Sequence, residues 1–327
     1  MTANGILQIA FYFIVLVAAA VPLGRYMTNV YAGEPGVFGR VASLLERGIY
    51  RCCRIDAEEE MTWQAYAGGL LMFNLAGWLA LYLLQRFQGF LPLNPRGLSA
   101  VPPDLAFNTA VSFVTNTNWQ AYGGETTMAI LTQTAGLAVQ NFASAASGMA
   151  VLSALIRGLK RTMSRTIGNV WVDLTRSIVY VLLPLSLILS LFLVSQGVVQ
   201  TLDGTVRVQL LEPTRDEQGR AISEQEIPLG PAASQVAIKQ LGTNGGGFFN
   251  ANSAHPLENP TPLSNFLEML AILLIPTALC LTFGRMVGDR RQGWALLAAM
   301  MIILIPLLGV CLLGEQAGNL SFGPMNV

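Results

Sequence analysis

Two short stretches of the chain carry residue types that could bind an ion. They read TNTNWQ at residues 115–120 and GTNGGG at residues 242–247. Their side chains and backbone offer hydroxyl, amide and carbonyl oxygens, and neither stretch contains a carboxylate. Neutral oxygens that replace a hydration shell bind weakly hydrated monovalent cations such as potassium, whereas calcium prefers carboxylates. The two stretches therefore predict a path for a monovalent cation.

Each stretch supplies its own set of candidate ligands. The first set is Thr115, Asn116, Thr117, Asn118 and the neighbouring Gln120. The second set is Gly242, Thr243, Asn244, Gly245, Gly246 and Gly247. Because glycine tolerates positive φ, successive carbonyl groups of the second stretch can turn toward one axis. We interpret the two sets as two walls of a filter that holds K⁺.

The two stretches are also related to each other. Residues 110–120 (AVSFVTNTNWQ) align without a gap with residues 237–247 (AIKQLGTNGGG). Short apolar helices, predicted over 105–114 and 234–241, lead into them, and their carbonyl ends would present partial negative charge to a cation. A single Asn- and Gly-rich stretch is more typical of an exposed turn. Two such stretches that align without a gap favour the cation path instead.

The composition predicts that these loops lie in a membrane protein. The chain is 53% hydrophobic and 12% charged, and its mean hydropathy is +0.51. A soluble protein of this length carries far more charge. Its formal net charge of zero gives no argument for nucleic-acid binding. Apolar segments long enough to cross a bilayer cover about 6–23, 65–84, 128–156, 170–194, 263–283 and 295–313.

The basic residues predict the orientation of these segments. They cluster after the first, third and fifth segments, as Arg25, Arg40, Arg47, Arg51 and Arg54, then Arg157, Lys160, Arg161 and Arg165, then Arg285, Arg290 and Arg291. Short basic loops mark the cytoplasm, so the N-terminus and both polar loops are expected outside. The first segment lacks the charged n-region of a signal peptide, which favours an uncleaved membrane helix.

The expected fold class is an all-α polytopic membrane protein. Residues 1–62 would hold the first membrane helix and a cytoplasmic loop, and 63–158 a first helix–pore loop–helix repeat. Residues 168–286 would form a second repeat, with an outer insertion at 196–231 whose turn signals suggest a hairpin. Residues 294–327 would begin a third repeat. About six spanning helices are expected, with an incomplete set of repeats.

Several charged residues lie near the expected membrane segments. Lys239 is interpreted either as a cation that tunes the filter or as an outer-surface lysine paired with a carboxylate. Glu268 is expected to snorkel toward the outer interface, and the alternative is that it faces the vestibule or a partner subunit. Asp173 and Arg176, three residues apart, suggest a structural ion pair. His255, the sole histidine, is expected to be a loop residue rather than a ligand.

Several longer runs resemble one protein family. They are FNTAVSFVTNTNWQAYGGETT, QNFASAASGMAV, GNVWVDLTRS, LGTNGGGFFNANSAHPLENPTPLSNF and MVGDRRQG. They are similar to the potassium-binding and translocating subunit of the bacterial Kdp potassium-transporting ATPase. This resemblance implies the fold of the potassium transporter superfamily, in which four helix–pore loop–helix repeats surround one filter. The third and fourth filter loops are absent, so the chain resembles about the first three-fifths of such a protein. It is expected to be a fragment or a truncated product.

The resemblance also implies partners and a location. Potassium-binding proteins of this family work with three other components of the Kdp complex in the bacterial inner membrane: a P-type ATPase, a single-helix protein and a small protein. They select K⁺ outside and pass it to the P-type ATPase, which alone uses ATP. This chain would then be a non-catalytic subunit without an organic cofactor. The carried-over filter residues are those of the two sets above.

Other functions remain open on the residues alone. A nucleotide-binding reading of Gly245–Gly247 fails because no Lys-Ser/Thr pair follows the glycines, and no DKTGT motif is present. A homodimeric channel or secondary transporter would place two loops from each copy around one axis. A nonfunctional remnant that only assembles with other subunits is the third possibility. Dependence on an ATPase partner separates the pump from the dimer, and potassium binding separates both from the remnant.

Overall fold

The computed structural model describes residues 2–34, 36, 39–215, 218–249 and 252–317. Within them, six helical spans are long and apolar enough to cross a membrane, as the sequence predicted. They are α1 (Ala3–Ala32), α3 (Trp63–Phe87, continued by a turn to Phe90), the π-helical turn Thr132–Ala138 with α6 (Val139–Lys160), α7 (Val170–Arg176) continued by Ser177–Leu182 into α8 (Leu183–Ser195), α10 (Pro262–Met286) and α11 (Arg290–Ala317). The fold is therefore mainly helical, as expected for a polytopic membrane protein.

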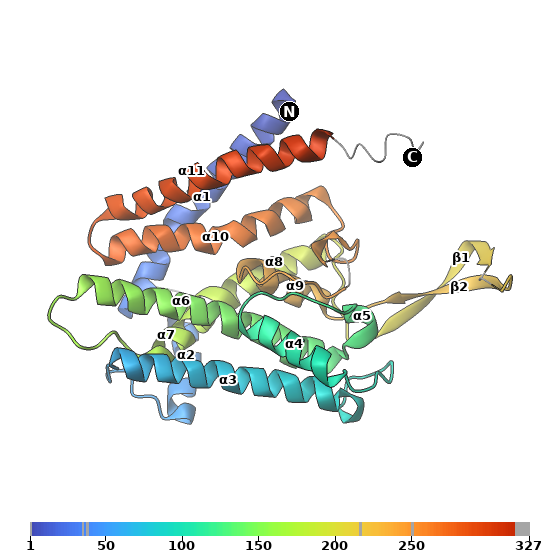
Figure 1. Cartoon of the computed structure of the whole chain (residues 1–327), viewed down its shortest axis with the longest axis horizontal. Coiled ribbons are helices and arrows are strands. Elements are labelled where there is room, and N and C mark those ends of the chain that lie inside the picture. Colours follow the sequence, from blue (N-terminus) through green and yellow to red (C-terminus); the bar gives the residue numbers. More distant parts are fainter. Residues whose placement is uncertain (1, 35, 37–38, 216–217, 250–251, 318–327) are drawn as a thin grey trace.

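Shorter elements fill the connections between these spans. They are α2 (Gly39–Cys53), α4 (Pro103–Val114), α5 (Gly124–Thr127) and α9 (Ala232–Leu241). The strands β1 (Thr205–Arg215) and β2 (Ala221–Pro228) pair antiparallel and project well beyond the helices (Figure 1). The hairpin expected within residues 196–231 is thus confirmed. The two predicted lead helices are also confirmed, as α4 and α9.

The helix ends follow the local sequence. Thr62 caps α3 by accepting from the Ala65 backbone N–H, and Asn169 caps α7 by accepting from Trp171 and Val172. Thr261 begins α10 with a reciprocal capping box to Ser264. Each cap satisfies amide groups that the first turn of a helix leaves unpaired. These caps fix where α3, α7 and α10 begin.

Two helix–loop–helix units meet at α6, and the buried residues around α4 form a hydrophobic cluster of their own. In the first, α4 packs between α3 and α6, and in the second, α9 packs between α8 and α10 (Figure 1). The fully buried residues Ala146, Val181, Ala237, Ile238 and Ala278 come from α6, the turn before α8, α9 and α10. Small alanines on α6 let the neighbouring helices approach closely. The two units are thereby held against each other at α6.

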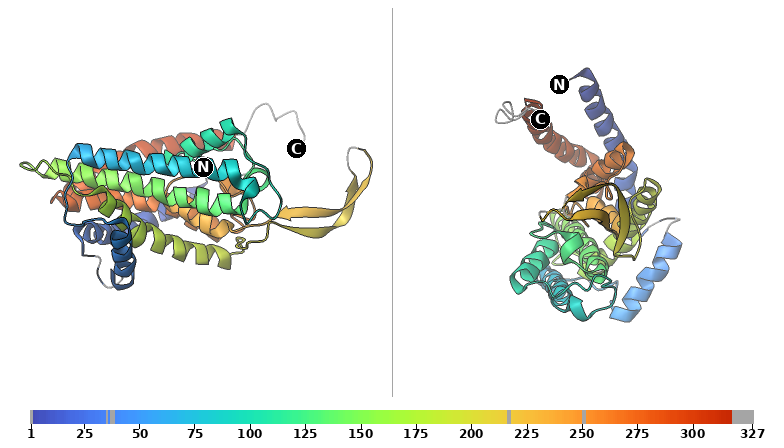
Figure 2. Two further views of the ribbon diagram at one scale, coloured as in Figure 1. Left: turned by 90° about the horizontal axis from the view of Figure 1, so that it is seen from below. Right: turned by 90° about the vertical axis from the view of Figure 1, so that its right-hand side faces the viewer.

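The helix α2 was not predicted from the sequence, which showed only a loop there. It lies at the side of the bundle in both views of Figure 2 and packs on α7 and the turn that follows it. Its Glu46 accepts from Arg176 (3.1 Å) and from the hydroxyls of Tyr50 and Tyr180 (2.8 and 2.6 Å). This short amphipathic helix is too polar for a hydropathy scan, which explains why it was missed.

The expected ion pair between Asp173 and Arg176 is wrong. Arg157 on α6 holds Asp173 in a bidentate pair, with N–O distances of 2.5 and 2.8 Å. Tyr66 on α3 donates to the same carboxylate at 2.9 Å, whereas Arg176 pairs with Glu46. The two residues are close along the helix, yet each side chain reaches a different neighbouring element.

Candidate cation-binding site

Both polar loops begin where a short helix ends, and they lie side by side. The first follows α4 and the second follows α9. Asn116 and Asn118 have φ values of 62° and 51°, and Thr243, Gly245 and Gly246 have values of 56°, 79° and 70°. A backbone that mixes left-handed with other conformations belongs to neither a regular helix nor a strand. This irregular backbone is compatible with the filter interpretation, which stays a prediction.

Only some residues of the two loops are exposed to solvent. Thr115, Thr117, Thr243 and Gly245 are exposed, whereas Asn118 and Asn244 are almost fully buried. Exposed and buried residues therefore alternate along each loop. The open edge carries threonine hydroxyl groups and backbone, and the asparagines point into the protein.

Amide side chains of the first loop tie it to the second. Asn116 donates to the carbonyl of Gly242 at 3.2 Å, and Asn118 to that of Gly245 at 3.5 Å. Gln120 makes two bonds to Gly247, one from its Nε2 to the carbonyl and one to its Oε1 from the backbone N–H, both 2.9 Å. These amides form a ladder that holds the loops in register.

Side chains of α6 form hydrogen bonds with the asparagines of this ladder. Asn141 Oδ1 accepts from Asn118 at 2.6 Å. Ser144 donates to Asn116 Oδ1 at 2.8 Å and accepts from Asn244 at 3.0 Å. Sequence reasoning did not place Asn141 or Ser144 at the site. The available signal was a pair of polar residues one turn apart in an alanine-rich span.

Two positions of the second loop need glycine because backbone oxygens of other residues lie close to them. A Cβ atom at Gly246 would lie 3.0 Å from the Asn118 carbonyl oxygen, and Gly246 also has positive φ. A Cβ atom at Gly247 would lie 2.7 Å from the carbonyl oxygen of Phe249. A side chain at either position would push the two loops apart or distort the turn that follows.

The structure brings together all residues of the two predicted sets, but it gives them different roles. The amides of Asn116, Asn118, Gln120 and Asn244 are engaged in the ladder or with α6. The groups left at the open edge are neutral. Such an edge can offer hydroxyl and carbonyl oxygens to a weakly hydrated cation.

The charged residues near the second loop lie where the sequence did not place them. Lys239 is paired with a carboxylate, that of Glu258, but the pair is buried rather than at the outer surface. Glu268 is also buried and accepts from Gln240 at 2.7 Å, so the expected snorkelling is wrong. His255 is a loop residue, as expected, and stacks on Phe249.

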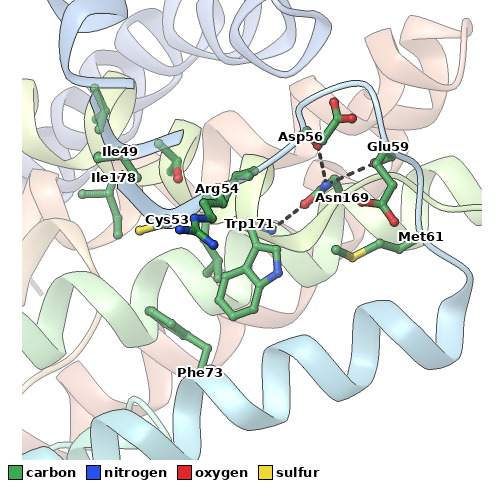
Figure 3. A pocket seen from close by; sticks show the side chains of 14 residues that line it. Ile49, Cys53, Arg54, Asp56, Glu59, Met61, Phe73, Asn169, Trp171 and Ile178 are labelled. Carbon is green, nitrogen blue, oxygen red and sulfur yellow. Dashed lines mark hydrogen bonds between the residues drawn. The ribbon is translucent and has the colours of Figure 1, made fainter. Parts of the chain in front are cut away.

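A cavity lies elsewhere in the protein, away from the two polar loops. It has a volume of about 600 Å³ and lies between α2, α3 and α7 (Figure 3). Phe73 and Trp171 contribute apolar side chains to its lining, and Arg54, Asp56 and Glu59 contribute charged ones. None of the residues of the two predicted sets lines it. It is therefore not part of the candidate cation site.

Comparison with known proteins identifies the family. Residues 10–325 match the family described as "Potassium-transporting ATPase A subunit". The chain belongs to this family. The resemblance suggested by the loop motifs is thereby confirmed, and it covers nearly the whole chain.

Individual relatives agree with this assignment. A "Potassium-transporting ATPase potassium-binding subunit" of Sorangium cellulosum is 64% identical over 327 residues, which are 100% of this chain and 56% of the relative. Proteins of the same description from Herpetosiphon aurantiacus and Clostridium botulinum are 61% and 52% identical, over 100% and 97% of this chain and 56% and 55% of each relative. The chain thus spans a little over half the length of the curated relatives it matches.

Proposed function

We propose that this chain provides two of the loops of a potassium filter in an ATP-driven potassium import complex. The observation that carries the proposal is the pair of loops that an amide ladder holds in register, with Thr115, Thr117, Thr243 and Gly245 at the open edge. In this proposal, the eleven residues of the two predicted sets comprise both the edge that meets K⁺ and the ladder that shapes it.

The partners are also proposed. The curated relatives are described as subunits of a potassium-transporting ATPase, and this supports assembly with the P-type ATPase of a Kdp complex. The single-helix protein and the small protein would complete that complex. The chain would lie in the bacterial inner membrane with its N-terminus outside, so that the loops meet K⁺ there and the ion passes to the P-type ATPase. ATP would be used by that partner alone.

Cation-dependent stability of the protein purified from its native membrane tests the binding proposal. A ligand that binds only the folded state raises the melting temperature as its concentration rises above Kd. We expect K⁺ and Rb⁺ to raise it, and Na⁺ or choline at equal ionic strength to leave it unchanged. Equal effects of all four cations would contradict a potassium filter.

The mass and companions of the same preparation test the assembly proposal. We expect an intact mass well above the 35.2 kDa of these 327 residues, together with a P-type ATPase. A mass of 35.2 kDa without an ATPase would instead favour the two-copy channel. The remnant is distinguished from both because it would show no potassium-dependent stabilisation.

A further inference from the structure

We propose that Lys239 and Glu258 act as a buried clamp that fixes the two ends of the second filter loop. They would be positioning residues, which shape the loop without touching the ion. This inference rests on the proposed potassium-binding function and assigns its selectivity partly to a pair outside the filter.

The Glu258 carboxylate joins the residues on both sides of the loop. Its Oε2 accepts from Lys239 Nζ, just before the loop, and its Oε1 accepts from the Phe249 backbone N–H at 2.8 Å, just after it. The side chain of Lys239 is 1% exposed and that of Glu258 is 0% exposed. One carboxylate thus connects the end of α9 to the chain that leaves residues 242–247.

The clamp is packed directly against the last glycine of the loop. A Cβ atom at Gly247 would lie 3.0 Å from Glu258 Oε1. On its other side, Gly247 is held by the two hydrogen bonds of Gln120. The end of the second loop is therefore fixed between Gln120 of the first loop and the clamp. A shift of the carboxylate would move the backbone that Gln120 holds in register.

Glu258 is itself held in place by a folded turn. Its backbone N–H donates to the carbonyl of His255 at 2.9 Å, and the His255 ring stacks on Phe249 with centroids 4.3 Å apart. Ser253, in the same segment, accepts from Gln240 of α9 at 2.8 Å. The carboxylate therefore has little freedom to follow a distorted loop.

The first loop has a shorter bridge at the equivalent position. Ser112 aligns with Lys239, and its hydroxyl donates to the Trp119 carbonyl at 3.1 Å, across its own loop. The backbone carbonyls of Ser112 and Lys239 accept from Asn118 and Asn244 at 3.1 and 2.9 Å. Both repeats thus connect this helix position to the far end of the loop. The second repeat uses an ion pair where the first uses one hydroxyl.

Stability alone does not require an ion pair here. Replacing a buried ion pair by neutral groups of similar size is often harmless, whereas removing one partner is strongly destabilising. A paired lysine and glutamate also carry no net charge, so the clamp can shape the loop with little effect on the field at the open edge. These two properties make the role testable by neutral replacement.

The test uses the double variant Lys239→Met/Glu258→Gln in the complete purified complex. The variant removes both charges together and leaves an acceptor for the Phe249 N–H, but it breaks the connection to α9. We expect near-normal abundance and K⁺ affinity reduced about tenfold, the factor expected for a lost hydrogen bond to a charged group. We also expect a lower ratio of K⁺ to Na⁺ affinity, which a loss of folded protein alone would not cause.

Two further variants keep the test decisive. Glu258→Asp keeps both charges but withdraws the carboxylate, and it should also lower the ratio of K⁺ to Na⁺ affinity. Arg157→Met/Asp173→Asn neutralises a buried pair away from the loops and should leave that ratio unchanged. A clamp variant that folds with unchanged K⁺ and Na⁺ affinities would overturn the inference. A wild-type complex that binds no K⁺ would overturn the proposed function and the clamp with it.

Discussion

Single glycines of the second loop differ in what surrounds them, although their backbone is similar. Gly245 and Gly246 both have positive φ, which costs about 1–2 kcal/mol for a residue with a side chain. A Cβ atom at Gly246 would also press on the Asn118 carbonyl at 3.0 Å, whereas at Gly245 the nearest atom is the Thr117 carbonyl oxygen at 3.9 Å. The two positions therefore separate backbone strain from loop displacement.

Gly246→Ala should weaken potassium binding more than Gly245→Ala. We expect about a tenfold loss of K⁺ affinity for Gly246→Ala, corresponding to about 1.4 kcal/mol, and a smaller loss for Gly245→Ala. Isothermal titration of the purified complex with K⁺ measures both, and the melting temperature without K⁺ controls for folding. Equal affinities in wild type and both variants would remove the second loop from the filter.

The sequence predicted the residue types at this site better than their roles. Neutral Thr, Asn and Gly residues in register were enough to indicate a monovalent cation. They did not show that Asn116, Asn118 and Gln120 bind the neighbouring loop. Those bonds depend on how two segments far apart in the chain are aligned in space. Lys239 and Glu268 were misplaced for the same reason, because their partners come from other segments.

Among the secondary-structure elements, one contact joins the residues just before α3 to the connection between α6 and α7. The backbones of Met61, Ile167 and Gly168 exchange hydrogen bonds of 2.8 and 3.0 Å. Next to them, Arg161 donates to both oxygens of Glu60 at 2.7 Å. Hydrogen bonds from Arg161 and Thr166 lower the pKa of Glu60 to about 2. The carboxylate is 43% exposed, so solvent screens the ion pair.

Glu60→Gln should therefore have a small and pH-dependent effect. A carboxyl group with a lowered pKa stabilises the fold above its unfolded pKa, and it loses this contribution as the pH falls toward its folded value. We expect the variant to lower the free energy of unfolding by less than about 1 kcal/mol at pH 7. The difference should shrink below about pH 4.5, the ordinary carboxyl value, and vanish near pH 2 or in high salt.

Thermal melts of wild type and variant across pH measure this difference. A constant difference at all pH values would show that Glu60 acts by packing and not by charge.

The long spans were predictable because hydropathy and length suffice to find them. Their ends were less predictable, since α1 runs to Ala32 and α11 begins at Arg290, beyond the apolar cores of both segments. The π-helical turns at Thr132–Ala138 and Ser177–Leu182 had no signal that we recognised. Such turns depend on how a helix packs on its neighbours, which a local sequence pattern does not record.

For the whole molecule, the orientation in the membrane remains a prediction from the basic residues. Cys52 and Cys53 are exposed at the end of α2, and Ser223 lies in the projecting hairpin. If the N-terminus is outside, these two places lie on opposite sides of the membrane.

Labelling with a membrane-impermeant maleimide tests the orientation. In right-side-out vesicles, and with Cys280 and Cys311 replaced by alanine, we expect Cys52 and Cys53 to react only after permeabilisation. A variant that also carries Cys52→Ala, Cys53→Ala and Ser223→Cys should react at once. The reverse pattern would place both polar loops in the cytoplasm.

The position of the bound ion relative to the two loops shows whether they hold it. Tl⁺ can replace K⁺ and scatters anomalously, so crystals of the complete complex grown with Tl⁺ would locate the ion. We expect an anomalous peak at the open edge formed by Thr115, Thr117, Thr243 and Gly245, and its loss in excess K⁺. Tl⁺ peaks elsewhere in the complex, with none at this edge, would show that the two loops do not hold the ion.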